Sequence, residues 1–371
     1  MKCKLSDICV FRKGKVDVSK LTLKTYISTE NMLPNKGGII EASSLPTAQL
    51  TQEYKKGDVL VSNIRPYFKK IWLAGHDGGC SNDVLVFQGN SNIDGDFLYY
   101  VLANDDFFAY SMATSKGTKM PRGDKTSIMQ YEVPKFDIDT QRKIASVLRC
   151  LDEKIELNFA INKNLEQQAQ AIFKSWFIDL EPFSNRKPSD WSVSTLGNVS
   201  IMGAGGDKPQ NVSPIKTDLY KYPIYSNGLS NEGLYGFTDK PKISEESVTV
   251  SARGTIGFVC LRHIPYVPIV RLVTLTPKTE IISAKYLYLW LKQLHITGTG
   301  TTQQQLTVPD FQKTEILVPS QEIVTLFTAT VDPIFEKIWA NQNENEKLSS
   351  LRDTLLPKLM SGELDVSSID L

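Results

Sequence analysis

Residues 151–176 read LDEKIELNFAINKNLEQQAQAIFKSW, and residues 334–359 read IFEKIWANQNENEKLSSLRDTLLPKL. In both stretches, mostly apolar residues recur at alternating spacings of four and three, which is the a/d pattern of a coiled-coil helix. Each seam carries a pair of asparagines: Asn158 and Asn162 in the first, and Asn341 and Asn345 in the second. A shift of 183 residues superimposes the two patterns, asparagines included. The chain therefore contains two matched long helices.

We expect these helices to pack on each other as an antiparallel coiled coil, because a buried Asn at a seam position penalises slipped registers. The predicted pairing seam consists of Leu151, Ile155, Asn158, Asn162, Leu165, Ile334, Ile338, Asn341, Asn345 and Leu348. The alternative is that each helix packs only on its own globular half, with its asparagines facing water. A helix of ~40 residues is about 60 Å long, so we expect the pair to hold two globular segments at a fixed distance. Asp332-Pro333 predicts a break, with a short helix before it.

Matches outside the helices extend the repeat. Residues 59–62 match residues 248–251, and residues 97–102 match residues 286–291, both at an offset of 189. Short β-rich runs bounded by Gly, Pro and Asn precede each short helix, for example Ile269–Leu275. The sequence therefore predicts an α+β fold with an internal pseudo-two-fold repeat, in which two similar mixed α/β domains are separated by the helices.

The repeat predicts four consecutive parts of the chain. They are a first globular domain at 1–138, a spacer helix at 139–182, a second globular domain at 183–320, and a second spacer helix with a C-terminal tail at 321–371. The stretch Tyr222–Tyr235, rich in Tyr, Asn and Gly, is compatible with a base-contacting loop or with a compact surface loop.

Composition and motifs exclude several classes of protein. The chain has 371 residues, 41% of them hydrophobic and 22% charged, so it can bury ordinary cores. Five scattered cysteines and three histidines show no metal-ligand or catalytic spacing, and no phosphate-binding loop or methyltransferase tetrapeptide is present. We therefore expect no catalytic residue and no metal. Without an apolar run of about 20 residues or a signal peptide, we expect a cytoplasmic protein that does not enter a membrane.

Candidate DNA contacts occur at equivalent places in the two halves. The net charge is only +1, so phosphate contacts must come from local clusters of Lys and Arg. Gln can pair bidentately with adenine, and Arg or Lys with guanine. The candidates are Arg65, Lys69, Lys70, Lys119, Arg122, Lys125, Arg253, Thr302, Gln303, Gln304 and Gln305. Ordinary solvated loops are the alternative for each cluster.

Several of these motifs resemble those of Type I restriction–modification specificity subunits. They are the run from Val250 to Gly257 (VSARGTIG), residues 300–303 (GTTQ), residues 117–125 (GTKMPRGDK) and the tail at 355–364 (LLPKLMSGEL). The resemblance spans nearly the whole chain, including its two-fold plan. One departure is that the first half has Asn63-Ile64-Arg65-Pro66-Tyr67 where the second has the ARGTIG run.

The resemblance implies a non-catalytic subunit that recognises a bipartite, asymmetric sequence in double-stranded DNA, one half per target-recognition domain. It also implies assembly with two methyltransferase subunits and with restriction/translocase subunits. S-adenosylmethionine, ATP and Mg would bind those partners, so the assembled complex would methylate adenine and cut DNA with ATP. Two alternatives remain open: a non-catalytic coiled-coil scaffold that binds proteins, and the recognition subunit of a related Type II (IIB/IIG-like) system.

Overall fold

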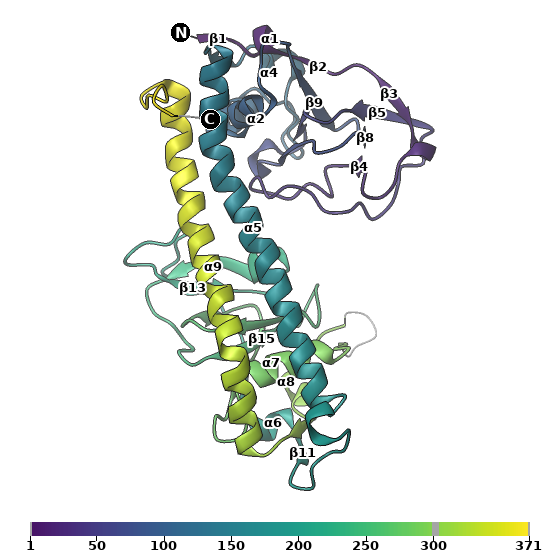
Figure 1. The fold of residues 1–371 in the computed structure, drawn as a ribbon, viewed down its shortest axis with the longest axis vertical. Coiled ribbons are helices and arrows are strands. Elements are labelled where there is room, and N and C mark those ends of the chain that lie inside the picture. The colour runs from purple at the N-terminus through teal and green to yellow at the C-terminus, as the bar shows by residue number, and fades with distance from the viewer. Residues whose placement is uncertain (1, 299–303, 370–371) are drawn as a thin grey trace. The chain divides into compact units, whose positions relative to one another are not determined.

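The computed structural model describes residues 2–298 and 304–369, and the chain forms two compact units (Figure 1). Unit 1 combines residues 1–158 with residues 342–371, and unit 2 comprises residues 159–341. Each unit contains a head of strands and short helices together with parts of two long helices, α5 (Ile138–Phe177) and α9 (Gln321–Ser361). Below, head 1 denotes residues 2–137 and head 2 denotes residues 178–320.

Head 1 contains two four-stranded sheets and a two-stranded pair. The first sheet is antiparallel, in the order β2 (Cys9–Phe11), β9 (Val84–Gly89), β6 (Val59–Ser62) and β7 (Ile71–Leu73). The second sheet has the order β3 (Lys15–Asp17), β5 (Leu50–Tyr54), β8 (Gly78–Cys80) and β4 (Tyr26–Ile27), with β4 parallel to β8. The pair consists of β1 (Lys2–Lys4) and β10 (Glu132–Pro134). Strand β6 coincides with residues 59–62, one of the runs that match across the repeat, whereas the short strands of the second sheet lack a clear alternation.

Strand β6 shows how the first sheet comes to be buried on both faces. Successive side chains of a strand point to opposite faces. Val59 and Val61 join the core that contains helix α2 (Gly95–Ala103), and Leu60 joins a second core with Val84 and Val86. A continuous apolar run such as VLVS is therefore what this central strand requires.

Head 2 repeats this plan with its own side chains. Its four-stranded antiparallel sheet has the order β12 (Ser200–Ala204), β18 (Val273–Pro277), β15 (Ser247–Val250) and β16 (Val259–Arg262). A three-stranded sheet has the order β14 (Leu234–Thr238), β13 (Tyr222–Tyr225) and β17 (Val267–Pro268), and β11 (Ser192–Thr195) pairs with β19 (Glu315–Val318). Helix α7 (Ala284–Gln293) takes the place of α2. The duplicated strand order confirms the predicted repeat.

Short helices fill the connections between these elements. They are α1 (Leu5–Ile8), α3 (Asp105–Ala113), α4 (Lys125–Ile128), α6 (Leu196–Val199) and α8 (Val308–Phe311), with 3₁₀ turns at Val18–Lys20, Pro66–Phe68, Glu181–Phe183 and Ser230–Gly233. In each unit, the principal core joins the head to both long helices. Ile144 and Leu359 take part in unit 1, and Phe173 and Phe327 in unit 2.

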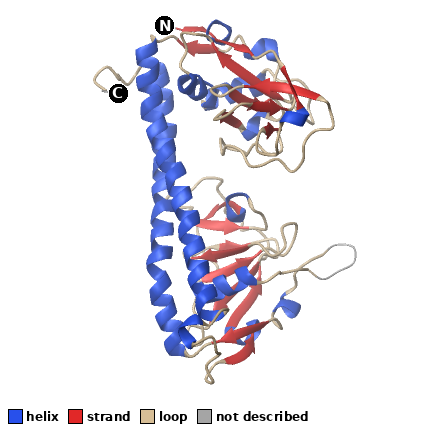
Figure 2. Ribbon diagram, turned by 45° about the vertical axis from the view of Figure 1, so that its right-hand side comes forward, coloured by secondary structure: helices blue, strands red, loops and turns tan. Residues whose placement is uncertain are grey.

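The long helices pair in antiparallel fashion within each unit, as predicted (Figure 2). In unit 1, the Asn158 amide donates to Asn345 Oδ1 at 2.8 Å. In unit 2, the Asn341 amide donates to Asn162 Oδ1, also at 2.8 Å. Asn158 and Asn341, which are equivalent in the repeat, are both buried, so the water-facing alternative is wrong. That the helices hold the heads at a fixed distance stays a prediction.

The predicted break at Asp332-Pro333 is wrong, because α9 is one helix from Gln321 to Ser361. Pro333 removes the hydrogen bond to the carbonyl of Ala329, but Ala329 is exposed and water can satisfy that carbonyl. Val331 and Phe335 on either side of the proline are buried in the unit 2 core. Tertiary packing therefore overrides the local signal.

Two shorter segments also differ from expectation. The strand predicted over Ile269–Leu275 begins only at Val273, because Val270 and Arg271 adopt left-handed backbone conformations with φ of 54° and 59°. The stretch Tyr222–Tyr235 is not a plain loop, since β13 and β14 pair there as a hairpin around a 3₁₀ turn.

Candidate nucleic-acid interface

In head 1, the structure brings together the two loops that the sequence singled out. One loop follows β6 and the other precedes α4. The Gly123 amide donates to the Asn63 carbonyl at 3.1 Å, and the Arg65 amide donates to the Pro121 carbonyl at 2.8 Å. An isolated bridge pairs Ile64 with Arg122. Arg65 and Arg122 therefore belong to one paired loop structure, although they are more than 50 residues apart.

Head 2 has the same arrangement. The Leu306 amide donates to the Ala252 carbonyl at 3.0 Å, where Ala252 is equivalent to Asn63 and Leu306 to Gly123. The Arg253 guanidinium donates from two nitrogens to Gln305 Oε1, at 2.8 and 3.1 Å. Thus both heads join a loop after the central strand to a loop before a short helix, and both carry an arginine there.

The other candidates in head 1 differ in whether their charged group is already bonded to another residue of the head. Lys119 is exposed, whereas Arg122 forms an ion pair with Asp83 at 3.1 Å and Lys69 one with Asp105 at 2.7 Å. The Lys70 ammonium donates to the Thr29 carbonyl at 2.6 Å, and burial lowers its pKa. Lys70 is the candidate that is most committed to the protein interior.

Arg65 adopts a left-handed conformation (φ 51°), and its Nε is buried without a partner among the described residues. A buried unpaired donor is costly, so this arginine is held by its backbone setting and not by its side-chain bonds. In head 2, Gln304 is exposed, and Thr302 and Gln303 lie outside the described residues.

A hollow of about 280 Å³ in head 1 adds a residue that the sequence analysis missed. Its lining includes Phe11, Arg12, Lys15, Asn82 and Lys125, and no carboxylate is among its lining residues, all of which lie in the described part of the chain. Lys125 Nζ lies 5.9 Å from the centre of the Phe11 ring, and Lys15 Nζ lies 3.4 Å from Asn82 Oδ1. Lys15 follows Arg12 and Lys13 in the sequence, but this cluster has no basic counterpart in the second half of the chain, and so it was not among the predicted contacts.

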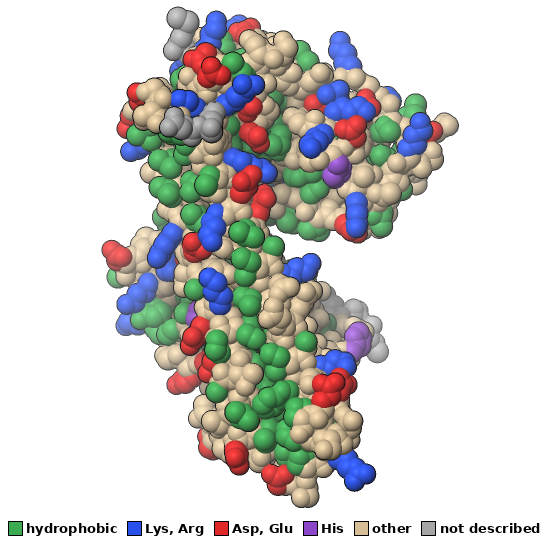
Figure 3. Space-filling model, viewed as in Figure 1, with side chains coloured by type: hydrophobic (Ala, Val, Ile, Leu, Met, Phe, Trp, Pro, Cys, Tyr) green, Lys and Arg blue, Asp and Glu red, His purple; other side chains and the backbone are tan. Residues whose placement is uncertain are grey.

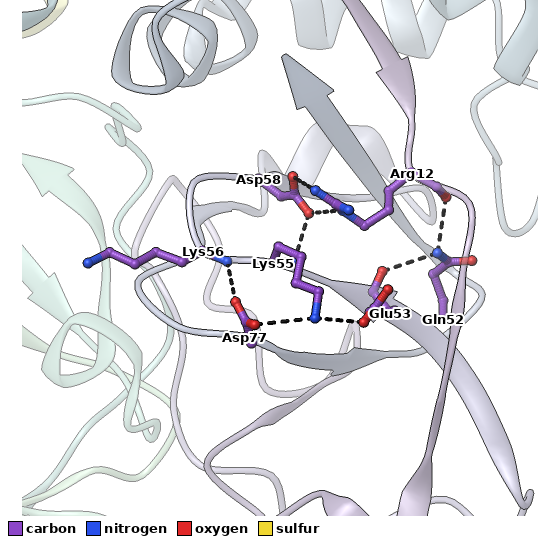
Figure 4. Close-up of polar contacts among 7 residues, drawn as sticks. All are labelled: Arg12, Gln52, Glu53, Lys55, Lys56, Asp58 and Asp77. Carbon is purple, nitrogen blue, oxygen red and sulfur yellow. Dashed lines mark hydrogen bonds and ion pairs between the residues drawn. The ribbon is translucent and has the colours of Figure 1, made fainter. Parts of the chain in front are cut away.

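The neighbouring charges in head 1 largely neutralise one another (Figure 4). The Arg12 guanidinium binds both carboxylate oxygens of Asp58. Lys55 forms ion pairs with Glu53 at 2.8 Å and Asp77 at 3.3 Å. The Lys56 amide donates to Asp77, which lowers the pKa of that carboxyl. Of the cations that line the hollow, Arg12 is therefore paired with Asp58, whereas Lys15 and Lys125 form no ion pair with a described residue.

Basic side chains on the visible face of head 1 are interspersed with acidic ones, without a continuous basic patch (Figure 3). This agrees with the near-neutral net charge. Electrostatic attraction of DNA to this face would therefore act through a few local contacts.

The hairpin of β13 and β14 packs on a buried arginine, Arg262. The Arg262 guanidinium lies 3.6 Å from the centre of the Tyr225 ring and donates to the Glu232 carboxylate at 2.9 Å and to its carbonyl at 2.7 Å. Leu229 and Tyr235 remain 60% and 50% exposed. The hairpin thus presents apolar and aromatic side chains on a rigid base.

The described residues provide little for a metal site or a membrane span. Among them, no cluster of three or more His, Cys, Asp or Glu side chains is arranged to hold a metal ion. None of their helices combines the length and the apolar character needed to cross a bilayer.

The fold and these loops define an internally duplicated protein whose two heads present equivalent, arginine-bearing loop pairs. A family model described as the Type I restriction modification DNA specificity domain matches residues 1–167 and, a second time, residues 188–350. The chain therefore belongs to this family.

Similar proteins agree with this assignment. The Type I restriction enzyme HindI specificity subunit of Haemophilus influenzae is 28% identical, over 97% of this chain and 98% of the relative. The MjaIX specificity subunit of Methanocaldococcus jannaschii is also 28% identical, over 85% of this chain and 79% of the relative. The solved structure of a Type I restriction–modification S subunit from M. genitalium has the same fold, with a TM-score of 0.58 and 18% identity over 97% of this chain and 96% of that one.

Proposed function

We propose that this chain is the DNA-recognition subunit of a Type I restriction–modification complex and that each head contacts one half of a split, asymmetric target. The observation that carries the proposal is the pair of equivalent loop structures, 63–65 with 121–123 in head 1 and 252–253 with 305–306 in head 2. They share a backbone plan and differ in side chains. Two similar scaffolds with different contact residues suit a site whose halves differ in sequence.

The contact chemistry follows from the side chains at each loop pair. Head 1 supplies Arg65, Lys119 and Arg122, which suit phosphate oxygens and the O6 and N7 acceptors of guanine. Head 2 supplies Arg253 and Gln305. Because Gln305 Oε1 accepts from Arg253, the amide and guanidinium are fixed relative to each other before DNA arrives. Such preorganisation reduces the entropy that binding would otherwise cost.

The hollow around Lys15 and Lys125 supplies phosphate contacts in this proposal. A phosphate oxygen between the two ammonium groups would gain charge-assisted hydrogen bonds, and Asn82 offers an amide beside them. Such contacts orient the head on the duplex without selecting a base.

The chemistry of restriction and modification would belong to other subunits. We propose that the chain assembles in the cytoplasm with two methyltransferase subunits and with restriction/translocase subunits. S-adenosylmethionine, ATP and Mg would bind to those partners. In this arrangement the chain is not an enzyme, and it determines where the complex acts.

Selection from a random DNA library tests the proposal. The chain, assembled with its methyltransferase subunits, is incubated with random duplexes, and the bound fraction is sequenced at two salt concentrations. We expect enrichment of two short unlike motifs at one fixed spacing, with affinity that falls steeply with salt. Binding without any enriched motif would contradict the proposal, and so would failure to bind DNA at low salt.

A further inference from the structure

Helix α7 of head 2 contacts α9 through a buried ion pair. Lys285 is 8% exposed, and its ammonium lies 2.9 Å from Asp332 and 3.1 Å from Glu246. The ammonium also lies 5.2 Å from the centre of the Trp339 ring. Lys285 stands on the second residue of α7, and Asp332 in the part of α9 that belongs to unit 2. This contact therefore connects head 2 to its own helix segment.

The equivalent positions in unit 1 carry the opposite charges. An offset of 189 relates Lys285 to Asp96 on α2, and an offset of 183 relates Asp332 to Arg149 on α5. The structure supports both offsets. The N-cap residues Asp94 and Ser283 are equivalent, and the long helices begin at the equivalent residues Ile138 and Gln321.

Hydrogen bonds on both sides of Asp96 hold α2 against α5 in unit 1. The Asp94 amide donates to Gln141 Oε1 at 3.0 Å, and the Tyr100 hydroxyl donates to Asp152 at 2.7 Å. Asp96 lies between these contacts on α2, and Arg149 lies on the facing helix α5. The two form no direct ion pair, but burial raises the pKa of Asp96 and the charge of Arg149 lowers it. Arg149 also forms an ion pair with Glu153 at 3.0 Å.

The two units differ in whether the head or the long helix carries the positive charge. In unit 2 the lysine of the head is balanced by Asp332 of α9 and by Glu246 of the head itself. In unit 1 the arginine of α5 forms an ion pair with Glu153 of its own helix, and Asp96 of the head is the opposite charge across the head–helix contact, without a direct ion pair. In each unit, the helix residue and the head residue thus have opposite signs, and the sign is reversed between units.

We propose that these reversed pairs, Asp96 with Arg149 and Lys285 with Asp332, make each head dock only on its own helix segment. Head 2 on the α5 segment would place Lys285 against Arg149, and head 1 on the α9 segment would place Asp96 against Asp332. Like charges at a partly buried interface repel and suppress the wrong pairing. Docking chemistry would thereby determine which helix segment each head packs on, whatever the heads bind.

A double-mutant cycle in the full chain tests the pairing first. Glu246→Gln serves as the background for unit 2, because Glu246 would repel an acidic residue at position 285. In that background, Lys285→Asp and Asp332→Arg each lower the thermal unfolding midpoint, and the double variant recovers at least half of the loss. Lys285→Asp combined with Arg149→Asp, one change in each unit, shows added losses and no recovery. If the within-pair double variant is no better than its worse single variant, the proposal is overturned.

A head-exchanged chain tests the docking rule itself. Head 2 is placed before α5 and head 1 before α9, so that both pairs become like-charged. Adding Arg149→Asp and Asp332→Arg restores opposite charges in the exchanged chain but destroys them in the native order. We expect these two changes to raise the midpoint of the exchanged chain by roughly 3 °C or more and to lower that of the native chain by a similar amount. A shift of the same sign in both chains would contradict the proposal. If the exchanged chain does not fold in either form, the double-mutant cycle decides.

Discussion

At one set of three equivalent positions, the head–helix contact is polar in unit 1 and apolar in unit 2. In unit 1, Tyr100 donates to Asp152, and Asp152 accepts from Arg352 of α9 at 2.7 Å. The equivalent positions in unit 2 hold Leu289, Phe335 and Ala169, all buried in its core. The two units thus differ at all three positions together, and changing a single member of the polar set would leave a buried polar group without its partner.

The aromatic content of the two contacts also differs. In unit 2, the rings of Phe173, Phe177, Tyr286 and Phe327 lie with centroids 4.9 to 6.3 Å apart, in the range of favourable ring pairs. The equivalent residues of unit 1 are Leu356, Met360, Phe97 and Ile144. The two units therefore share a backbone plan, but different side chains fill their head–helix interfaces.

The largest effect is expected from the aromatic cluster of unit 2. Phe173 is fully buried between α7 and α9, and Phe173→Ala should lower the free energy of unfolding by about 4 kcal/mol through lost contacts and the cavity left behind. Urea unfolding followed by tryptophan fluorescence measures the loss. Leu326→Ala on the exposed face of α9 is the control and should cost less than about 0.5 kcal/mol. Similar losses for both variants would show that the cluster does not hold unit 2 together.

Breaking the polar set of unit 1 comes next. Arg352→Ala leaves the Asp152 carboxylate in a site where only 15% of that side chain is exposed, and we expect a loss of about 3 kcal/mol. The triple variant Tyr100→Leu, Asp152→Phe and Arg352→Ala copies the unit 2 set and should return to within about 1 kcal/mol of the parent. A triple variant less stable than Arg352→Ala would mean that unit 1 cannot accept the apolar interior.

The asparagine pairs should have a smaller effect. Asn345→Ala removes one of the two acceptors of the buried Asn158 amide, which also donates to Glu344 at 2.8 Å, so we expect a loss of about 1 kcal/mol. Chemical denaturation with the exposed neighbour Asn343→Ala as a control checks this value. Equal and negligible losses for the two variants would indicate that the pair does not stabilise the seam.

The smallest effect concerns DNA and leaves stability unchanged. If Lys15 and Lys125 each contact a phosphate, replacing both by Ala should reduce the slope of log affinity against log salt by about 1.8. Fluorescence anisotropy with the assembled complex measures the slope, and the exposed Lys20→Ala is the control. An unchanged slope in the double variant would remove the hollow from the interface without affecting the rest of the proposal.

The sequence predicted the regular parts of this molecule well, because they are periodic. The predicted helical regions begin at residues 139 and 321, within one residue of the starts of α5 and α9, and the matched asparagines predicted that the two helices pack on each other. Pro333 led to the wrong prediction of a helix break, because the neighbouring sequence does not show that Val331 and Phe335 are buried. The repeat itself placed the two loop pairs at equivalent positions.

Less of the candidate site could be predicted. The partners that engage Lys69, Lys70 and Arg122 lie up to 41 residues away in sequence, and only the folded chain brings them together. Lys15 was not predicted as a DNA contact, because the other residues that line the hollow include members of three other strands and a helix. Sequence patterns find local clusters of charge, whereas pairing and burial determine which of those charges remain available.

The most direct test of the account is target selection with one loop pair altered at a time. Arg253→Ala with Gln305→Ala changes head 2, and Lys119→Ala with Arg122→Ala changes head 1, each in the chain assembled with its methyltransferase subunits. We expect each double variant to lose base preference in one half of the selected site, and a different half for each variant. The other half and the spacing should stay as in the parent. Loss of preference in both halves from either variant, or in neither half from both, would contradict the assignment of one half-site to each head.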